Sequence, residues 1–173
     1  MRCAAVLLAT TSALIGCGSD PGSATPLPLP APVSGVDNGA AVTFTHGMAR
    51  SLVGLTDVWS YGVHPDSTPY GVFISSAELS CSTDLGTKNP PQGYTLLITF
   101  ASTEVGATAE KNKLFRHAGG WLDTNGADAT TPTIIKAADA ESLDASLDLT
   151  WEWYDGTVGS LAGDVSVASC LEP

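Results

Sequence analysis

The chain has little positive charge. Seven Lys and Arg residues stand against eighteen Asp and Glu residues, and the formal net charge is −11 at pH 7. A protein that binds nucleic acid needs basic side chains to neutralise phosphates, and an excess of acid repels them. The composition therefore argues against nucleic acid as a partner.

Long apolar runs are also missing. Residues 4–15 are mainly apolar, but a helix that spans a bilayer needs about 20 such residues. The run follows Met1 and Arg2, and a short apolar run behind a positive N-terminus is typical of a signal peptide. We expect residues 1–16 to be a signal peptide that is removed.

The end of this run carries a recognisable motif. Leu14, Ile15, Gly16 and Cys17 resemble the lipobox of bacterial lipoproteins. The resemblance implies cleavage after Gly16 and a diacylglyceryl group on Cys17, which holds a protein on a membrane stably. Gly18 rather than Asp after the cysteine implies the outer membrane of a bacterial cell envelope rather than the inner one. The alternative is an ordinary secretory signal with a freely secreted product.

Residues 17–35 are rich in proline, glycine and serine, with prolines at Pro21, Pro26, Pro28, Pro30 and Pro32. Closely spaced prolines favour extended polyproline II structure. We expect the lipidated Cys17 and a tether here, with a proline-rich ligand for a partner domain as the alternative. Residues 36–173 are then a single domain, which resembles no family specifically.

Cysteine is scarce, and each of the four cysteines can be given a role. Cys3 leaves with the signal peptide and Cys17 takes the lipid, so Cys81 and Cys170 remain. Two cysteines in an exported domain predict a disulfide. A zinc site or a catalytic thiol is the alternative, but the spacing of the cysteines supports neither.

Hydrophobic side chains recur mostly with a period of two, which indicates strands. The clearest run is 143–154, and 161–170 can return beside it as a hairpin; further strands are expected at 42–45, 58–63, 72–81 and 94–100. Turn signals are found at Asn38-Gly39, Pro65 to Pro69, Pro90-Pro91 and Asn125-Gly126. With these turns between the runs, the pattern predicts an all-β fold, an antiparallel sandwich or partly open barrel of about seven to nine strands. At most one or two short helices are expected, at 107–118 and 137–143.

Two tryptophans lie near the end of the long run. Trp151 and Trp153 share a strand face with aliphatic residues, which predicts that they lie in the core. If this face lay outward at its tryptophan end, the pair would form an aromatic shelf for a sugar.

Candidate metal ligands are weak. Asp123, Asn125 and Asp128 could bind calcium, but their spacing differs from that of an EF-hand, and a hairpin turn at Asn125-Gly126 is the preferred interpretation.

A row of carboxylates lies on the other face of the long run. Asp144, Asp148 and Glu152 are about 13 Å apart along it, too far to share an ion, so we interpret them as a solvated face. Only a carboxylate from a neighbouring strand, such as Asp164, could turn this row into a site.

No catalytic motif is found. His46, His64 and His117 are scattered, with no His-Glu-x-x-His pair and no Gly-x-Ser-x-Gly elbow. The sequence thus favours a cell-envelope lipoprotein that is a non-catalytic binding or accessory module, with an unknown protein or glycan partner and no cofactor. The alternatives are a carbohydrate-binding module using Trp151 and Trp153, and an extracytoplasmic hydrolase whose site forms only in the fold.

Overall fold

The computed structural model describes residues 25–55, 69–83, 91–118 and 121–171, of which 121–125 are described by their backbone only. These residues form ten strands: β1 (Pro28–Asp37), β2 (Ala40–Ser51), β3 (Tyr70–Ser75), β4 (Gly93–Phe100), β5 (Lys111–Ala118), β6 (Trp121–Gly126), β7 (Asp128–Ala129), β8 (Ile134–Ala138), β9 (Ser142–Glu152) and β10 (Val158–Ser169). The strand predicted at 58–63 and His64 lie outside the described residues.

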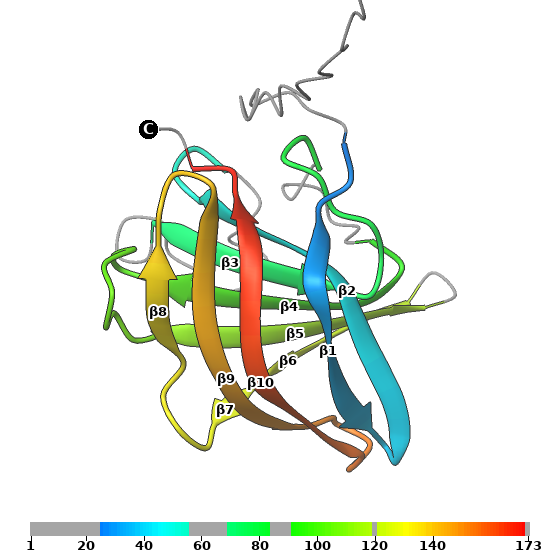
Figure 1. The fold of residues 1–173 in the computed structure, drawn as a ribbon. Coiled ribbons are helices and arrows are strands. Elements are labelled where there is room, and N and C mark those ends of the chain that lie inside the picture. The colour runs from blue at the N-terminus through cyan, green and yellow to red at the C-terminus, as the bar shows by residue number, and fades with distance from the viewer. Residues whose placement is uncertain (1–24, 56–68, 84–90, 119–120, 172–173) are drawn as a thin grey trace, which may run out of the picture.

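All ten strands belong to one sheet that curls on itself (Figure 1). Its order is β6-β5-β4-β3-β2-β1-β10-β9-β7, with β8 also paired to β9, and neighbouring strands are antiparallel apart from a short β2–β10 contact. Ala127 alone separates β6, the neighbour of β5, from β7, the neighbour of β9. A bridge between Thr108 and Ile134 draws the start of β5 to β8. The sheet is therefore a nearly closed barrel, and the predicted all-β class is confirmed.

β1 occupies much of the segment predicted to be a tether. Pro28–Asp37 pairs with β2 and, from Gly35 onwards, with β10. Proline cannot donate a ladder hydrogen bond, but Pro30 and Pro32 fall where the β1–β2 register shifts between Pro28 and Val33. The tether prediction is wrong for residues 28–35, and the folded domain begins before residue 36.

Both predicted helices are wrong. β5 fills most of 107–118, and β8 and β9 occupy most of 137–143. The residues of β5 tolerate a helix, but Leu114 faces the barrel interior while Phe115 is buried on the outer face, which only a strand allows. No helix in the described part of the chain is long and apolar enough to cross a membrane.

Two hydrophobic clusters stabilise the sheet. The larger one fills the barrel and includes Phe44, Ile74, Ile98, Leu149 and Val165. The smaller one lies on the outer face of β2 to β5 and consists of Met48, Leu52, Phe73, Leu79, Leu97 and Phe115. β4 is therefore buried on both faces. This explains why the apolar Leu97 lies between Thr95 and Thr99 on the face that is otherwise polar.

The predicted disulfide between Cys81 and Cys170 is confirmed. It joins the segment after β3 to the end of β10, across 89 positions of sequence. Cys81 lies beyond β3 rather than inside a strand that reaches residue 81, so that predicted strand is too long. The bridge lies at the end of the barrel where β1 begins, since Leu27 donates to the carbonyl of Leu79 close by.

Candidate functional site

The end of β1 directs a carboxylate into the barrel. Alternate residues of this strand, Val33, Gly35 and Asp37, are buried. Asn38 and Gly39 have φ of 50° and 76°, and positive φ at both central residues is what a two-residue type I′ hairpin turn requires. The turn predicted at Asn38-Gly39 thus forms, and it places Asp37 inside, only 4% exposed.

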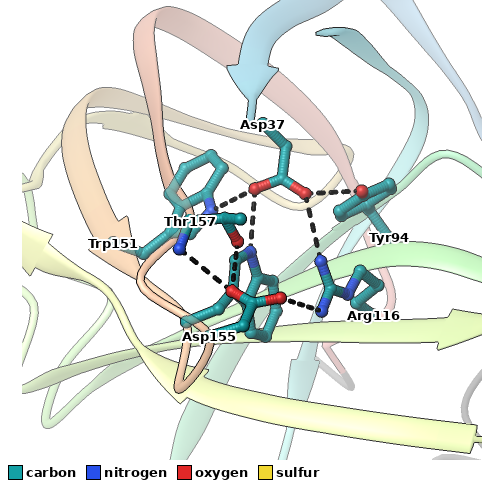
Figure 2. A network of polar contacts seen from close by, with 7 residues as sticks. Asp37, Tyr94, Arg116, Trp151, Asp155 and Thr157 are labelled. Carbon is teal, nitrogen blue, oxygen red and sulfur yellow. Dashed lines mark hydrogen bonds and ion pairs between the residues drawn. The ribbon is translucent and has the colours of Figure 1, made fainter. Parts of the chain in front are cut away.

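Asp37 is surrounded by side chains that donate hydrogen bonds to it (Figure 2). Tyr94 Oη of β4 donates to Oδ2 at 2.6 Å. The Nε1 groups of Trp151, on β9, and Trp153, just after β9, donate to Oδ1 at 3.0 and 2.8 Å. A buried carboxylate is stable only when its oxygens are satisfied, and here three donors from two sides of the barrel meet on it.

Arg116 of β5 supplies the opposite charge. Its Nη1 lies 3.7 Å from Asp37 Oδ2, and its Nη2 lies 3.9 Å from Oδ2 of Asp155 in the β9–β10 turn. Its guanidinium also stacks over the ring of Trp153, 4.4 Å from the centroid. Arg116 therefore joins the wall formed by β4 and β5 to the β9–β10 hairpin.

The environment fixes the protonation of this cluster. Burial alone would raise the pKa of Asp37, but the hydrogen bonds from Tyr94, Trp151 and Trp153 and the charge of Arg116 together hold that pKa below its usual value. Burial and the hydrogen bond to Asp37 raise the pKa of Tyr94 to about 12. At neutral pH the carboxylate is ionised and the phenol keeps its proton. The cluster is suited to holding four elements together rather than to moving protons.

The tryptophans are core residues, as preferred from the sequence. Trp151 and Trp153 are 4% and 3% exposed, and both indole N–H groups are used by Asp37. An aromatic shelf for a sugar requires exposed ring faces. The hypothesis of a carbohydrate platform at Trp151 and Trp153 is therefore wrong.

An open hollow of about 510 Å³ lies on the outside of the barrel over this cluster. Its lining comes from β1, the β1–β2 turn, β7, β9 and β10: Val36, Gly39, Asp128, Thr150, Trp151, Glu152, Val158, Gly159 and Ser160. The strand register orders these residues into two rows. Asp128, Thr150, Ser160 and Val36 follow one another across β7, β9, β10 and β1, and Glu152 faces Val158 in the next row.

The hollow is acidic on one side and apolar on the other. Asp128 and Glu152 lie towards β7 and β9, while Val36 and Val158 are 44% and 60% exposed towards β1 and β10. The hydroxyls of Thr150 and Ser160 lie between them in the register. This arrangement can accept a cationic group beside an aliphatic one.

The hollow rests directly on the buried cluster. Gly159 pairs with both Asp37 and Trp151, and a Cβ on Gly159 would collide with the indole of Trp151. The outward neighbours Val36 and Glu152 are therefore held by a fixed inner layer.

The carboxylate row on β9 is spread along the outer face of the barrel. Asp144, Asp148 and Glu152 lie on the outer face, as expected, and Asp164 lies opposite Ser146 in the register. Lys136 Nζ binds Asp164 at 2.6 Å. Among the described residues, no three His, Cys, Asp or Glu side chains gather closely enough to hold a metal ion.

The proposed calcium loop is largely strand. Asp123 and Asn125 lie on β6, where their backbones pair with Arg116 and Leu114, and Asp128 is on β7. The side chains of Asp123 and Asn125 are outside the described part of the structure. The hairpin turn predicted at Asn125-Gly126 is wrong, because β6 and β7 pair with different strands to close the barrel.

The two histidines whose structure is described lie on different strands. His46 Nδ1 is 2.9 Å from Oγ1 of its neighbour Thr45 on β2, and the His117 ring on β5 is 3.0 Å from Gln92 Nε2. Neither histidine lines the hollow.

The sequence pointed to the tryptophans but not to Asp37, Tyr94 or Arg116. A usable signal was present, since two buried indoles need acceptors and Asp37 directly precedes a hairpin turn. The chain shows no significant match to any protein-family model, curated protein or solved structure.

Proposed function

We propose that the protein is a lipoprotein of the bacterial cell envelope, anchored through Cys17 in the outer membrane, whose barrel is a non-catalytic binding or accessory module. The lipobox-like run Leu14-Ile15-Gly16-Cys17 is the observation that carries this proposal. Two acyl chains on one cysteine give stable membrane attachment, so the barrel itself need not contact lipid.

The disulfide supports an exported location. Bridges between cysteines persist in oxidising compartments, and Cys81 and Cys170 are joined in the folded domain. The domain is also close to its anchor, because ten residues separate Cys17 from Pro28 and span at most about 35 Å when fully extended.

A binding role fits the chemistry of the described residues better than catalysis does. The carboxylate of Asp37 is buried, accepts three hydrogen bonds and lies beside Arg116. The hollow above it offers carboxylates, hydroxyls and valines without a histidine or cysteine. We therefore propose a partner that docks on the outside of the barrel.

The anchor can be tested by replacing Cys17 with Ser. Without the thiol no acyl group can be added, so the variant is expected either to leave the membrane fraction or to accumulate as an uncleaved precursor. Cys3→Ser is the matched control, because Cys3 lies in the predicted leader and should not change anchoring. A Cys17→Ser protein that is processed and pellets with membranes like the parent would contradict the proposal.

A further inference from the structure

The hollow lies at the end of the barrel away from the point where the chain enters it. β1 begins at Pro28, near the Cys81–Cys170 bridge, and reaches Asp37 after ten strand residues, about 30 Å further on. In Figure 1 this start is at the top of the barrel and the β1–β2 and β9–β10 turns are at the bottom. An anchor before Pro28 therefore leaves the hollow on the opposite end.

The negative charge of the hollow disfavours anionic ligands. Asp128 and Glu152 contribute negative charge in a protein of net charge −11, and no Lys, Arg or His is among the described residues that line it. Phosphate-bearing ligands are repelled. Trp151 is the one aromatic side chain among the described residues that line the hollow, and it is buried, so the lining offers a sugar no ring face to stack on.

The strand register sets the distance between the apolar end and the acidic end of the hollow. The row from Val36 to Asp128 crosses four adjacent strands, so its ends are about 14 Å apart. In an extended peptide, side chains four positions apart are separated by about 13 Å. A peptide lying across the strands can thus place an aliphatic side chain at Val36 and a basic one at Asp128. Val158 and Glu152 face each other on β10 and β9 between these two ends, with Val158 towards Val36 and Glu152 towards Asp128.

We propose that this hollow docks a segment of a partner protein that carries Lys or Arg four positions from Val, Ile or Leu. The proposal rests on the function proposed above, because it names the partner of the displayed module. The buried cluster beneath the hollow holds its walls in place before binding, which lowers the ordering cost of association.

The test is selection from a phage-displayed library of random dodecapeptides on the full-length protein, purified in mild detergent. We expect enriched peptides to carry a basic and an aliphatic residue at the stated spacing, and their binding to weaken with added salt. Such a preparation can be made whether or not Cys17 is acylated, so a failed selection leaves the anchor proposal standing. A protein without acyl chains likewise leaves the hollow testable.

Variants then locate the site. Glu152→Lys and, separately, Asp128→Lys should raise the Kd of an enriched peptide by at least about tenfold, because each places like charges in contact. Val158→Ser should weaken binding several-fold. Glu104→Lys and Val105→Ser are the matched controls, since both residues are exposed in the segment between β4 and β5, away from the hollow, and should leave the Kd unchanged.

Three results would overturn the proposal. One is enrichment of peptides without basic residues, or no enrichment at all. Another is equal weakening by Glu104→Lys and by both hollow variants, which would indicate attraction by the net charge alone. The third is unchanged binding in folded Val158→Ser, Glu152→Lys and Asp128→Lys proteins.

Discussion

Asp37 is the residue on which one end of the barrel depends. Burying a carboxylate is costly, and here the cost is offset by three charge-assisted hydrogen bonds and by Arg116. The partners come from β4, β5 and the end of β9, so the side chain links parts of the sheet that lie far apart in sequence. Such a cluster stabilises when complete and destabilises when one partner is lost.

Asp37→Asn is therefore expected to lower the free energy of unfolding by about 2 to 3 kcal/mol at pH 7, measured by chemical denaturation. The substitution removes the charge, leaves Arg116 without its buried partner and turns one acceptor into a donor that faces other donors. Asp164→Asn is the matched control, because Asp164 is exposed and its pairing with Lys136 is a surface ion pair that contributes little.

The difference in stability between the parent protein and Asp37→Asn should depend on pH. The folded pKa of Asp37 lies below its unfolded value near 3.8, so its contribution is present above that value and is lost as the pH falls through the folded pKa. The difference in unfolding free energy between parent and Asp37→Asn should thus shrink below about pH 4. A difference that stays constant from pH 7 to pH 3 would argue against an ionised Asp37.

At the scale of elements, the β1–β2 turn sets where Asp37 points. Gly39 has a φ of 76° and open space where a Cβ would lie, so a side chain there meets backbone strain but no clash. Gly39→Ala should lower the free energy of unfolding by about 1 kcal/mol. Gly126→Ala is the control, since Gly126 has equally open surroundings and no positive φ. If the two variants were equally stable, the type I′ turn would be wrong.

The β9–β10 hairpin and β4 were predicted well because their hydrophobic residues recur with a period of two. The β9–β10 hairpin was predicted because Leu143 to Trp151 alternate with polar residues, and β9 buries every second position. β4 was predicted because Leu96, Ile98 and Phe100 alternate with Thr95 and Thr99, although both of its faces are buried. In each case local alternation and tertiary burial agree, so a single sequence suffices.

The strands that were missed are those in which local preference and tertiary pairing disagree. β1 begins in a proline-rich segment, and its register shift accommodates the prolines in a way that no local pattern reveals. β5 has helix-tolerant residues but is buried on both faces. β6 and β7 close the barrel through Ala127, and the pairing partners that decide this lie elsewhere in the chain. The candidate site could not be predicted for the same reason, because Asp37, Trp151 and Asp128 come together only through the pairing of β1, β7, β9 and β10.

On the scale of the whole molecule, the two ends of the barrel differ in character. One end holds the start of β1 and the Cys81–Cys170 bridge, which constrains the unfolded chain over 89 positions. The other end holds the buried cluster and the hollow above it. We propose an anchor at the first end and a docking surface at the second, which is the arrangement that a displayed binding module requires.

We propose that Cys17 is the lipidated N-terminus of the mature protein. Mass spectrometry of the N-terminal proteolytic peptide, taken from protein extracted from membranes with detergent, tests this proposal. We expect a peptide that begins at Cys17 and carries the mass of a diacylglyceryl group. A peptide that begins at Met1, or one in which Cys17 is unmodified, would show that the proposed anchor is wrong.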